Sequence, residues 1–120
     1  MKIIKLKCEE RIPKEYTGII EWDNGDKIWL KNDIYHREDG PAVIYKKGYM
    51  SWYLDGKFLL SSYGNLWLTN QILLSKEKHP EYPIVQVWKI LDKDKIYEQI
   101  MIPGMEEFIK NENNEGIMFI

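Results

Sequence analysis

The stretch IIEWDNGDKIWLKNDIY at residues 19–35 returns, shifted by 23 residues, as AVIYKKGYMSWYLDGKF at residues 42–58. The shift places Trp29 on Trp52 and Gly25 on Gly48, so turn residues fall on turn residues. A third, shortened copy follows 15 residues after the second, at Trp67, Asn70 and Leu73. Because one short repeat cannot bury its apolar face alone, we expect neighbouring copies to cover one another.

Between the turns, apolar and polar residues alternate over about four to seven residues, which predicts short antiparallel strands joined as hairpins. Asn24-Gly25 and Asp55-Gly56 are residue pairs that accept positive φ in tight hairpin turns. We expect residues 17–74 to form one continuous antiparallel sheet along which Trp29, Trp52 and Trp67 stack. On a strand, the adjacent Trp52 and Tyr53 must point to opposite faces.

A more specific pattern joins the first two copies, the run His36-Arg37-Glu38-Asp39-Gly40-Pro41-Ala42. With Gly48 and Trp52-Tyr53-Leu54-Asp55-Gly56 it resembles the MORN-variant repeats, short β-hairpin units of bacterial, phage and giant-virus proteins. The resemblance covers about residues 16–74. It implies successive antiparallel hairpins, and it implies no shared set of catalytic residues. The chain departs from the family by carrying a single full Glu-Asp-Gly-Pro-Ala run and by placing Gln71 where a turn glycine is expected.

Length and composition limit the class of protein. A chain of 120 residues with 44% hydrophobic and 30% charged residues predicts one folded domain, residues 1–120. Lys and Arg number 17 against 19 Asp and Glu, so there is no global basic field for nucleic acid. The single cysteine excludes an internal disulfide. Together with the lack of an apolar run long enough for a membrane span or signal peptide, it predicts a cytoplasmic protein.

The second half of the chain, residues 84–120, is predicted to hold a hairpin, a short helix and a closing strand. The polar residues 76–83 predict a linker into it. Residues 86–101 read as a hairpin, while their apolar spacing also fits a helix, and the pattern leaves both open. Residues 105–110 predict a short helix. The apolar ends, residues 3–6 and 117–120, are expected to pair into the sheet as closing strands.

The strongest candidates for catalytic residues are His36, Glu38 and Asp39, because an imidazole beside carboxylates can act in general acid–base catalysis or bind a metal ion. They define one alternative hypothesis, a small metal-dependent hydrolase or nuclease. On a strand, however, His36 and Glu38 share a face while Asp39 begins a turn. We therefore expect these residues to brace the fold, and we predict no catalytic residue, metal or cofactor. His79 is placed in the linker, and Cys8 is interpreted as an inert strand cysteine.

The aromatic residues support the preferred hypothesis, a non-catalytic protein-binding module that is not an enzyme. Its partner-binding face is predicted from Trp22, Tyr45 and Tyr53 with the turns at Asp39 and Asp55, because rigid aromatic surfaces recognise proteins well. The partner is expected to be a protein and not nucleic acid or a membrane. A phage or mobile-element protein that binds and inhibits a host factor fits the resemblance. The remaining alternative is a structural or oligomerising unit, such as a homodimer.

Overall fold

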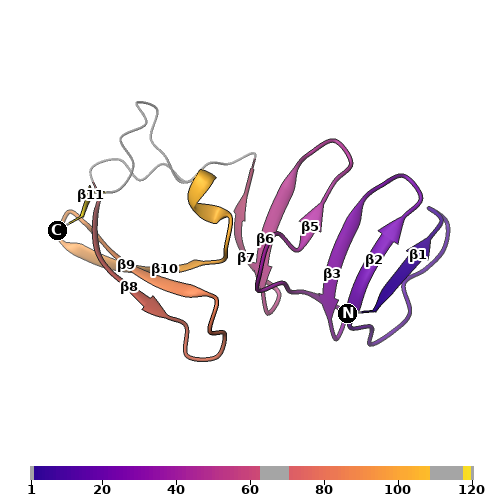
Figure 1. The fold of residues 1–120 in the computed structure, drawn as a ribbon, viewed down its shortest axis with the longest axis horizontal. Helices are drawn as coiled ribbons and strands as arrows, with labels where there is room; N and C mark the ends of the chain where they lie inside the picture. Colours follow the sequence, from indigo (N-terminus) through magenta and orange to yellow (C-terminus); the bar gives the residue numbers. More distant parts are fainter. Residues whose placement is uncertain (1, 63–70, 109–117, 120) are drawn as a thin grey trace.

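The computed structural model describes residues 2–62, 71–108 and 118–119, and these residues form two β-sheets (Figure 1). The strands of the first sheet are β1 (Ile3–Leu6), β2 (Gly18–Trp22), β3 (Lys27–Lys31), β4 (Ile34–Tyr35), β5 (Val43–Ile44), β6 (Met50–Leu54) and β7 (Lys57–Ser61). Those of the second sheet are β8 (Ile72–Lys78), β9 (Gln86–Asp92), β10 (Lys95–Met101) and β11 (Met118–Phe119). One 3-10 helix, η1 (Met105–Phe108), follows β10. The predicted class, mainly β with antiparallel hairpins, is confirmed.

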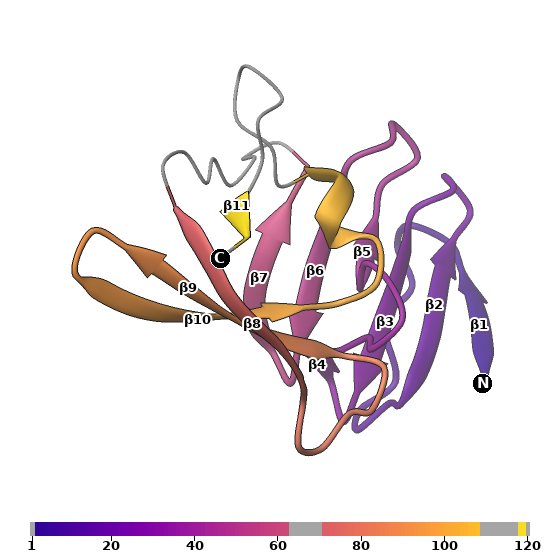
Figure 2. The same ribbon diagram turned by 60° about the vertical axis from the view of Figure 1, so that its left-hand side comes forward.

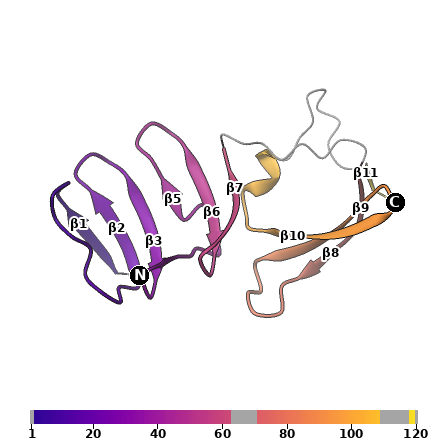
Figure 3. The same ribbon diagram turned by 180° about the vertical axis from the view of Figure 1, so that it is seen from behind.

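The first sheet runs in the spatial order β1-β2-β3-β5-β6-β7, and β4 pairs with β3 beside β5. All of its pairings are antiparallel except that of β1 with β2, which is parallel. Viewed from behind, β1 lies at the outer edge and the second sheet lies beyond β7 (Figure 3). Hairpins that follow one another in the sequence therefore lie side by side in the sheet.

The 23-residue repeat is visible in the backbone. In the first copy the Gly25 N–H donates to the Trp22 carbonyl at 2.9 Å, and in the second the Gly48 N–H donates to the Tyr45 carbonyl at 2.8 Å. The two glycines have nearly the same φ, 98° and 100°. Three strands thus make one copy: β2, β3 and β4 form the first, and β5, β6 and β7 form the second.

A second pair of equivalent turns ends β3 and β6. Asn32 and Asp33 have φ of 48° and 67°, and Asp55 and Gly56 have φ of 50° and 79°. Positive φ at both central residues is the requirement of a two-residue turn that matches the strand twist, and Asn and Asp tolerate it better than most residues. The prediction for Asp55-Gly56 is confirmed, whereas in Asn24-Gly25 only the glycine takes positive φ.

Two apolar clusters occupy opposite faces of the first sheet. One is built on β1, β2, β3 and β5, and the loop before β2 contributes Tyr16 to it. The other is shared by both sheets: it joins Trp52, Leu54 and Leu60 to Val85 and Trp88. Tyr53 packs against the first cluster and Trp52 lies in the second, so the prediction that these neighbours face opposite ways is confirmed.

The prediction of one continuous sheet over residues 17–74 is wrong. β8 begins the second sheet, as Figure 2 shows, and it also occupies residues 76–78, which were expected to belong to a linker. The polar side chains of this part of β8 make cross-strand contacts: the Lys76 ammonium lies 4.5 Å from the Trp88 ring centroid, and Glu77 pairs with Lys89 at 3.2 Å. Polarity therefore does not interrupt the strand. Trp67 and Asn70 of the third copy lie outside the described residues.

Residues 86–101 form a hairpin in which β9 and β10 pair antiparallel from Lys95↔Asp92 to Met101↔Gln86, so the helical alternative is wrong. The predicted short helix is present as η1, and residues 109–110 of that prediction lie outside the described part. The two closing strands lie in different sheets, because β1 pairs with β2 and β11 pairs with β8. Ile117 and Ile120 are outside the described residues. No helix in the described ranges has the length and apolar character needed to cross a membrane.

Trp29 and Trp52 do not stack as predicted. Both point to the face of the first sheet that carries the shared core, but β5 lies between their strands in the sheet. The backbone of Ala42 fills the space beside β5: its carbonyl accepts the Trp29 N–H at 2.8 Å, and its N–H donates to the Ser51 carbonyl at 2.9 Å. The repeat therefore places the two indoles on the same face, two strands apart.

Candidate functional site

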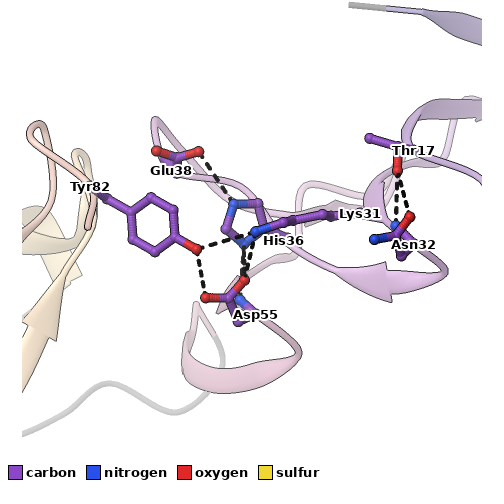
Figure 4. A network of polar contacts seen from close by, with 7 residues as sticks. All are labelled: Thr17, Lys31, Asn32, His36, Glu38, Asp55 and Tyr82. Carbon is purple, nitrogen blue, oxygen red and sulfur yellow. Dashed lines mark hydrogen bonds and ion pairs between the residues drawn. The ribbon is translucent and has the colours of Figure 1, made fainter.

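His36 lies between the two copies and closes a turn of the second. Its Nδ1 accepts the backbone N–H of Asp55 at 2.9 Å, and its Nε2 lies 3.3 Å from Glu38 Oε2 (Figure 4). Asp55 Oδ1 also lies 3.3 Å from Nδ1. The shorter backbone bond defines the role of Nδ1, because a ring nitrogen that accepts an N–H carries no hydrogen of its own. The hydrogen is thereby assigned to Nε2, which donates it to Glu38.

Tyr82, from the loop between β8 and β9, connects the second sheet to this turn. Its hydroxyl donates to Asp55 Oδ2 at 2.6 Å, and Lys31 Nζ donates to Asp55 Oδ1 at 3.1 Å and to the Tyr82 oxygen at 3.3 Å. The hydrogen bond from Tyr82 and the Lys31 ammonium lower the pKa of Asp55, against the opposing effect of partial burial. The same bond raises the pKa of Tyr82, and Asp55 raises the pKa of Lys31.

The Tyr82 ring lies against both histidines of the chain. Its centroid is 5.3 Å from that of His36 and 5.1 Å from that of His79. His79 Nδ1 accepts the Glu81 N–H at 3.1 Å, so each imidazole is held by a backbone donor while it supports the tyrosine. We call the group Lys31, His36, Glu38, Asp55 and Tyr82 the joint. It fixes the second sheet against the second copy of the repeat.

Arg37 explains the glycine of the motif. Its guanidinium carbon lies 4.0 Å from the Trp29 ring centroid, its Nε donates to Asp39 Oδ1 at 2.7 Å, and its Nη1 donates to the Pro41 carbonyl at 3.0 Å. A Cβ at Gly40 would sit 2.8 Å from that guanidinium carbon. A side chain at residue 40 would therefore displace the Arg37 guanidinium from this position. The acid that pairs with Arg37 is Asp39.

The residues of the hydrolase alternative do not converge. His36 and Glu38 face each other in the joint, whereas Asp39 is turned toward Arg37. Across the described ranges, no group of three or more His, Cys, Asp or Glu side chains is arranged to hold a metal ion. The motif as placed binds other parts of its own chain.

Three of the predicted partner-binding residues, Trp22, Tyr45 and Tyr53, share one face of the first sheet. The register sets Ile20 opposite Ile28, Ile28 opposite Val43, and Val43 opposite Ser51. Each predicted residue stands two positions after one of these residues on its strand, and side chains two apart on a strand point the same way. Trp22 is half-buried against the neighbouring core, while Tyr45 is exposed.

Two further rings extend this surface. The Tyr35 and Tyr53 centroids are 4.9 Å apart, and those of Tyr53 and Phe58 are 5.5 Å apart. Tyr35 and Tyr45 are exposed, and the Phe58 side chain is 53% exposed. Burial raises the pKa of Tyr35, and the nearby Tyr45 and Tyr53 raise it further. We call Tyr35, Tyr45, Tyr53 and Phe58 the aromatic face.

Sequence reasoning did not assign Tyr35 and Phe58 to a binding surface, although the 23-residue shift that superposes them was the available signal. The two acidic residues of the predicted surface lie elsewhere. Asp55 belongs to the joint, and Asp39 accepts from Arg37 through Oδ1 while its side chain stays exposed on the other side of the sheet. Tyr82 was missed as well, because nothing in the sequence near it points to Asp55.

Cys8 lies in an exposed turn after β1, not in a strand as expected. Its Sγ donates to Asp23 Oδ1 at 3.3 Å. That bond and the negative charge of Asp23 raise the pKa of the thiol, with a smaller effect from Glu9. The thiol form is therefore favoured over the reactive thiolate.

Comparisons of the chain with protein-family models, curated proteins and solved structures found no match.

Proposed function

We propose that this chain is a non-catalytic protein-binding module whose aromatic face docks a partner protein. The observation that carries the proposal is the contiguity of the rings: Tyr53 touches Tyr35 on one side and Phe58 on the other, and Tyr35 and Phe58 are exposed. Tyrosine and phenylalanine supply a large contact area with few rotatable bonds, and aromatic anchors dominate the energetics of protein interfaces.

The engagement of the polar motif supports a role without catalysis. Both ring nitrogens of His36 have partners, and the Asp39 carboxylate binds Arg37. A general base must be free to reach a substrate proton. In this module the motif is a brace that holds the sheet on which the rings are displayed.

The resemblance of residues 36–42 to MORN-variant repeats, together with the repeated turn geometry, supports the finer part of the proposal. The chain is a MORN-like repeat protein of a phage or another mobile element, and it inhibits the host factor that it binds. A single cysteine in 120 residues supports a cytoplasmic location.

The test is affinity capture of cellular proteins by the intact chain and by variants of matched design. Phe58→Ser removes an exposed ring from the aromatic face, and Ile96→Ser removes a 63% exposed side chain from β10 as the control. The parent chain and Ile96→Ser are expected to retain one common partner, whose affinity falls by about tenfold or more in Phe58→Ser.

Circular dichroism and the thermal midpoint verify that both variants fold. Equal capture by Phe58→Ser and Ile96→Ser contradicts the docking surface. Concentration-dependent self-association that is lost in Phe58→Ser, with no other protein captured, assigns the aromatic face to a homodimer instead.

A further inference from the structure

A groove of about 510 Å³ lies on the opposite side of the first sheet from the aromatic face. Its apolar walls come from Ile19 of β2, Trp29 of β3 and Ile84 of the loop between β8 and β9, and residues 36–39 form its polar side. The groove thus lies where the first sheet meets the second. Its volume is within the range of about 300–1,000 Å³ typical of pockets that hold a ligand.

The side chains of the apolar walls are partly exposed to solvent, although they adjoin the buried core shared by both sheets. Ile84 is 54% exposed, while its neighbour Val85 is fully buried in the shared core. Ile19 and Trp29 are half-buried. Leaving a large aliphatic side chain at the mouth of an aromatic-lined groove keeps apolar area in water, and contiguous apolar surface of this kind is typical of binding sites.

The charge at the mouth of the groove is negative. The Arg37 guanidinium is stacked on Trp29 and bound to Asp39 Oδ1 and the Pro41 carbonyl, which leaves its side chain 21% exposed. The side chains of Glu38 and Asp39 are 40% and 67% exposed. Two solvent-exposed carboxylates therefore stand against one largely covered guanidinium, which gives these three side chains a net charge of −1 with the negative groups outermost, and such an arrangement attracts positive groups.

We propose that this groove binds a basic segment of a partner protein in which apolar and cationic side chains alternate. An aliphatic side chain, or the stem of an arginine or lysine, packs between Ile84 and the Ile19–Trp29 wall, and the cationic head meets Glu38 and Asp39. Arginine and lysine stems bury readily against apolar surface while their charged ends stay wet. The site is separate from the aromatic face and does not depend on the function proposed for it.

The experiment measures binding of a fluorescein-labelled synthetic peptide of alternating Arg and Leu to the intact chain by fluorescence anisotropy. Two peptides of the same length serve as comparisons, one with Glu in place of Arg and one with Ser in place of Leu. The Arg-Leu peptide is expected to bind about tenfold more tightly than either, because both charge and apolar contact contribute. Its affinity is also expected to fall as salt is raised.

Variants locate the peptide on the molecule. Ile84→Ser is expected to weaken Arg-Leu binding by about tenfold, through the loss of buried apolar contact. Glu38→Gln is expected to weaken it by about threefold and to reduce its salt dependence, because a charge is lost while the oxygen beside His36 is retained. Ile96→Ser and Glu98→Gln make the same chemical changes on β10 and are expected to bind as the parent chain does.

Three results overturn the proposal: equal binding of the Arg-Ser and Arg-Leu peptides, equal binding of the Glu-Leu and Arg-Leu peptides, or equal loss in Ile84→Ser and Ile96→Ser. The first result would mean that peptide binding depends on surface charge alone. The second would mean that the charge of the peptide does not contribute to binding. Thermal midpoints establish that every variant is folded. Since the assay uses defined peptides and no cellular partner, its failure is distinct from a failure of the aromatic face.

Discussion

The two copies of the repeat have equivalent turns and different neighbours. Trp29 and Trp52 hold equivalent positions, yet Trp52 is 1% exposed beneath the second sheet while Trp29 is half-buried beneath Arg37. The turns that follow them share positive φ at both central residues. Local sequence therefore specifies the hairpin, and the element that packs over it decides how much each side chain contributes to stability.

The largest expected effect separates the two tryptophans. Trp52→Ala leaves a cavity in the core shared by both sheets and should lower the free energy of unfolding by about 3–5 kcal/mol. Trp29→Ala removes a half-buried ring and its contact with a guanidinium, and should cost about 1–2 kcal/mol. Denaturant midpoints at constant m-value measure both. Equal losses of unfolding free energy in the two variants would show that packing against the second sheet does not increase the contribution of Trp52 to stability.

The next test compares the glycine turns of the two copies by their contributions to stability. Gly25→Ala and Gly48→Ala should each cost about 1–2 kcal/mol, because both positions hold φ near 100°, where a Cβ is strained. A Cβ at Gly25 meets Lys46 carbons at 3.3 Å, while at Gly48 it meets open space. Thermal or urea unfolding gives both values. A cost at one glycine only would contradict the equivalence of the copies.

A smaller effect comes from the position where the first copy has Asn32 and the second has Asp55. Asp55→Asn should cost about 1 kcal/mol at neutral pH, since the partly exposed side chain loses its charge and one of the two oxygens that accept from Tyr82 and Lys31. The pKa of Asp55 is lowered in the folded chain. Its contribution is therefore complete above the unfolded pKa of about 3.9 and disappears as pH falls through the folded value.

Urea midpoints of the parent chain and Asp55→Asn across acid pH provide the measurement, and the two curves should converge at the lowest pH. Tyr82→Phe provides the corresponding control at alkaline pH. Because the pKa of Tyr82 is raised on folding, its contribution is present below about 10 and is lost as pH rises through the folded value. If the urea midpoints of Asp55→Asn and the parent chain stay equally far apart throughout the acid range, the contacts of Asp55 in the joint do not cause the difference in stability.

The smallest effect concerns Asp23, whose equivalent in the second copy is Lys46. Asp23→Asn removes the negative charge that raises the pKa of Cys8 and leaves only an amide oxygen as the acceptor, so the thiol should ionise at lower pH and react faster with iodoacetamide at neutral pH. The rate of alkylation against pH is the measurement. Glu9→Gln is the matched control and should shift the profile less. A larger shift in Glu9→Gln than in Asp23→Asn would contradict the contact between Cys8 and Asp23.

The local features of this fold were readable from the sequence. A positive φ depends on the residue type itself, so the sequence predicts turns at Gly25, Gly48 and Asp55-Gly56. The alternation of side chains along a strand predicts that Trp52 and Tyr53 point to opposite faces. The hairpin over residues 86–101 was also recognised, although periodicity left a helix open. These predictions depend on neighbours in the chain, and a single sequence records those neighbours directly.

The features that failed depend on contacts between distant segments. Leu73 falls in register with the repeat, but β8 pairs with β9 and belongs to the other sheet. Lys76 and Glu77 look like a linker because their cross-strand partners, Trp88 and Lys89, are supplied by β9. Asp55 was assigned to a partner surface because Tyr82, which occupies it, lies in a loop of the second sheet. Sheet membership and side-chain partners are set by packing, which a local pattern does not contain.

The cap that His36 provides for Asp55 has no equivalent in the second copy. In the second copy the shift by 23 residues puts Leu59 and Leu60 where the first has His36 and Arg37. Leu60 is buried in the core shared by both sheets, and Leu59 packs against that core. The same two positions of the repeat thus hold a neighbouring turn in place in the first copy and fill the shared core in the second.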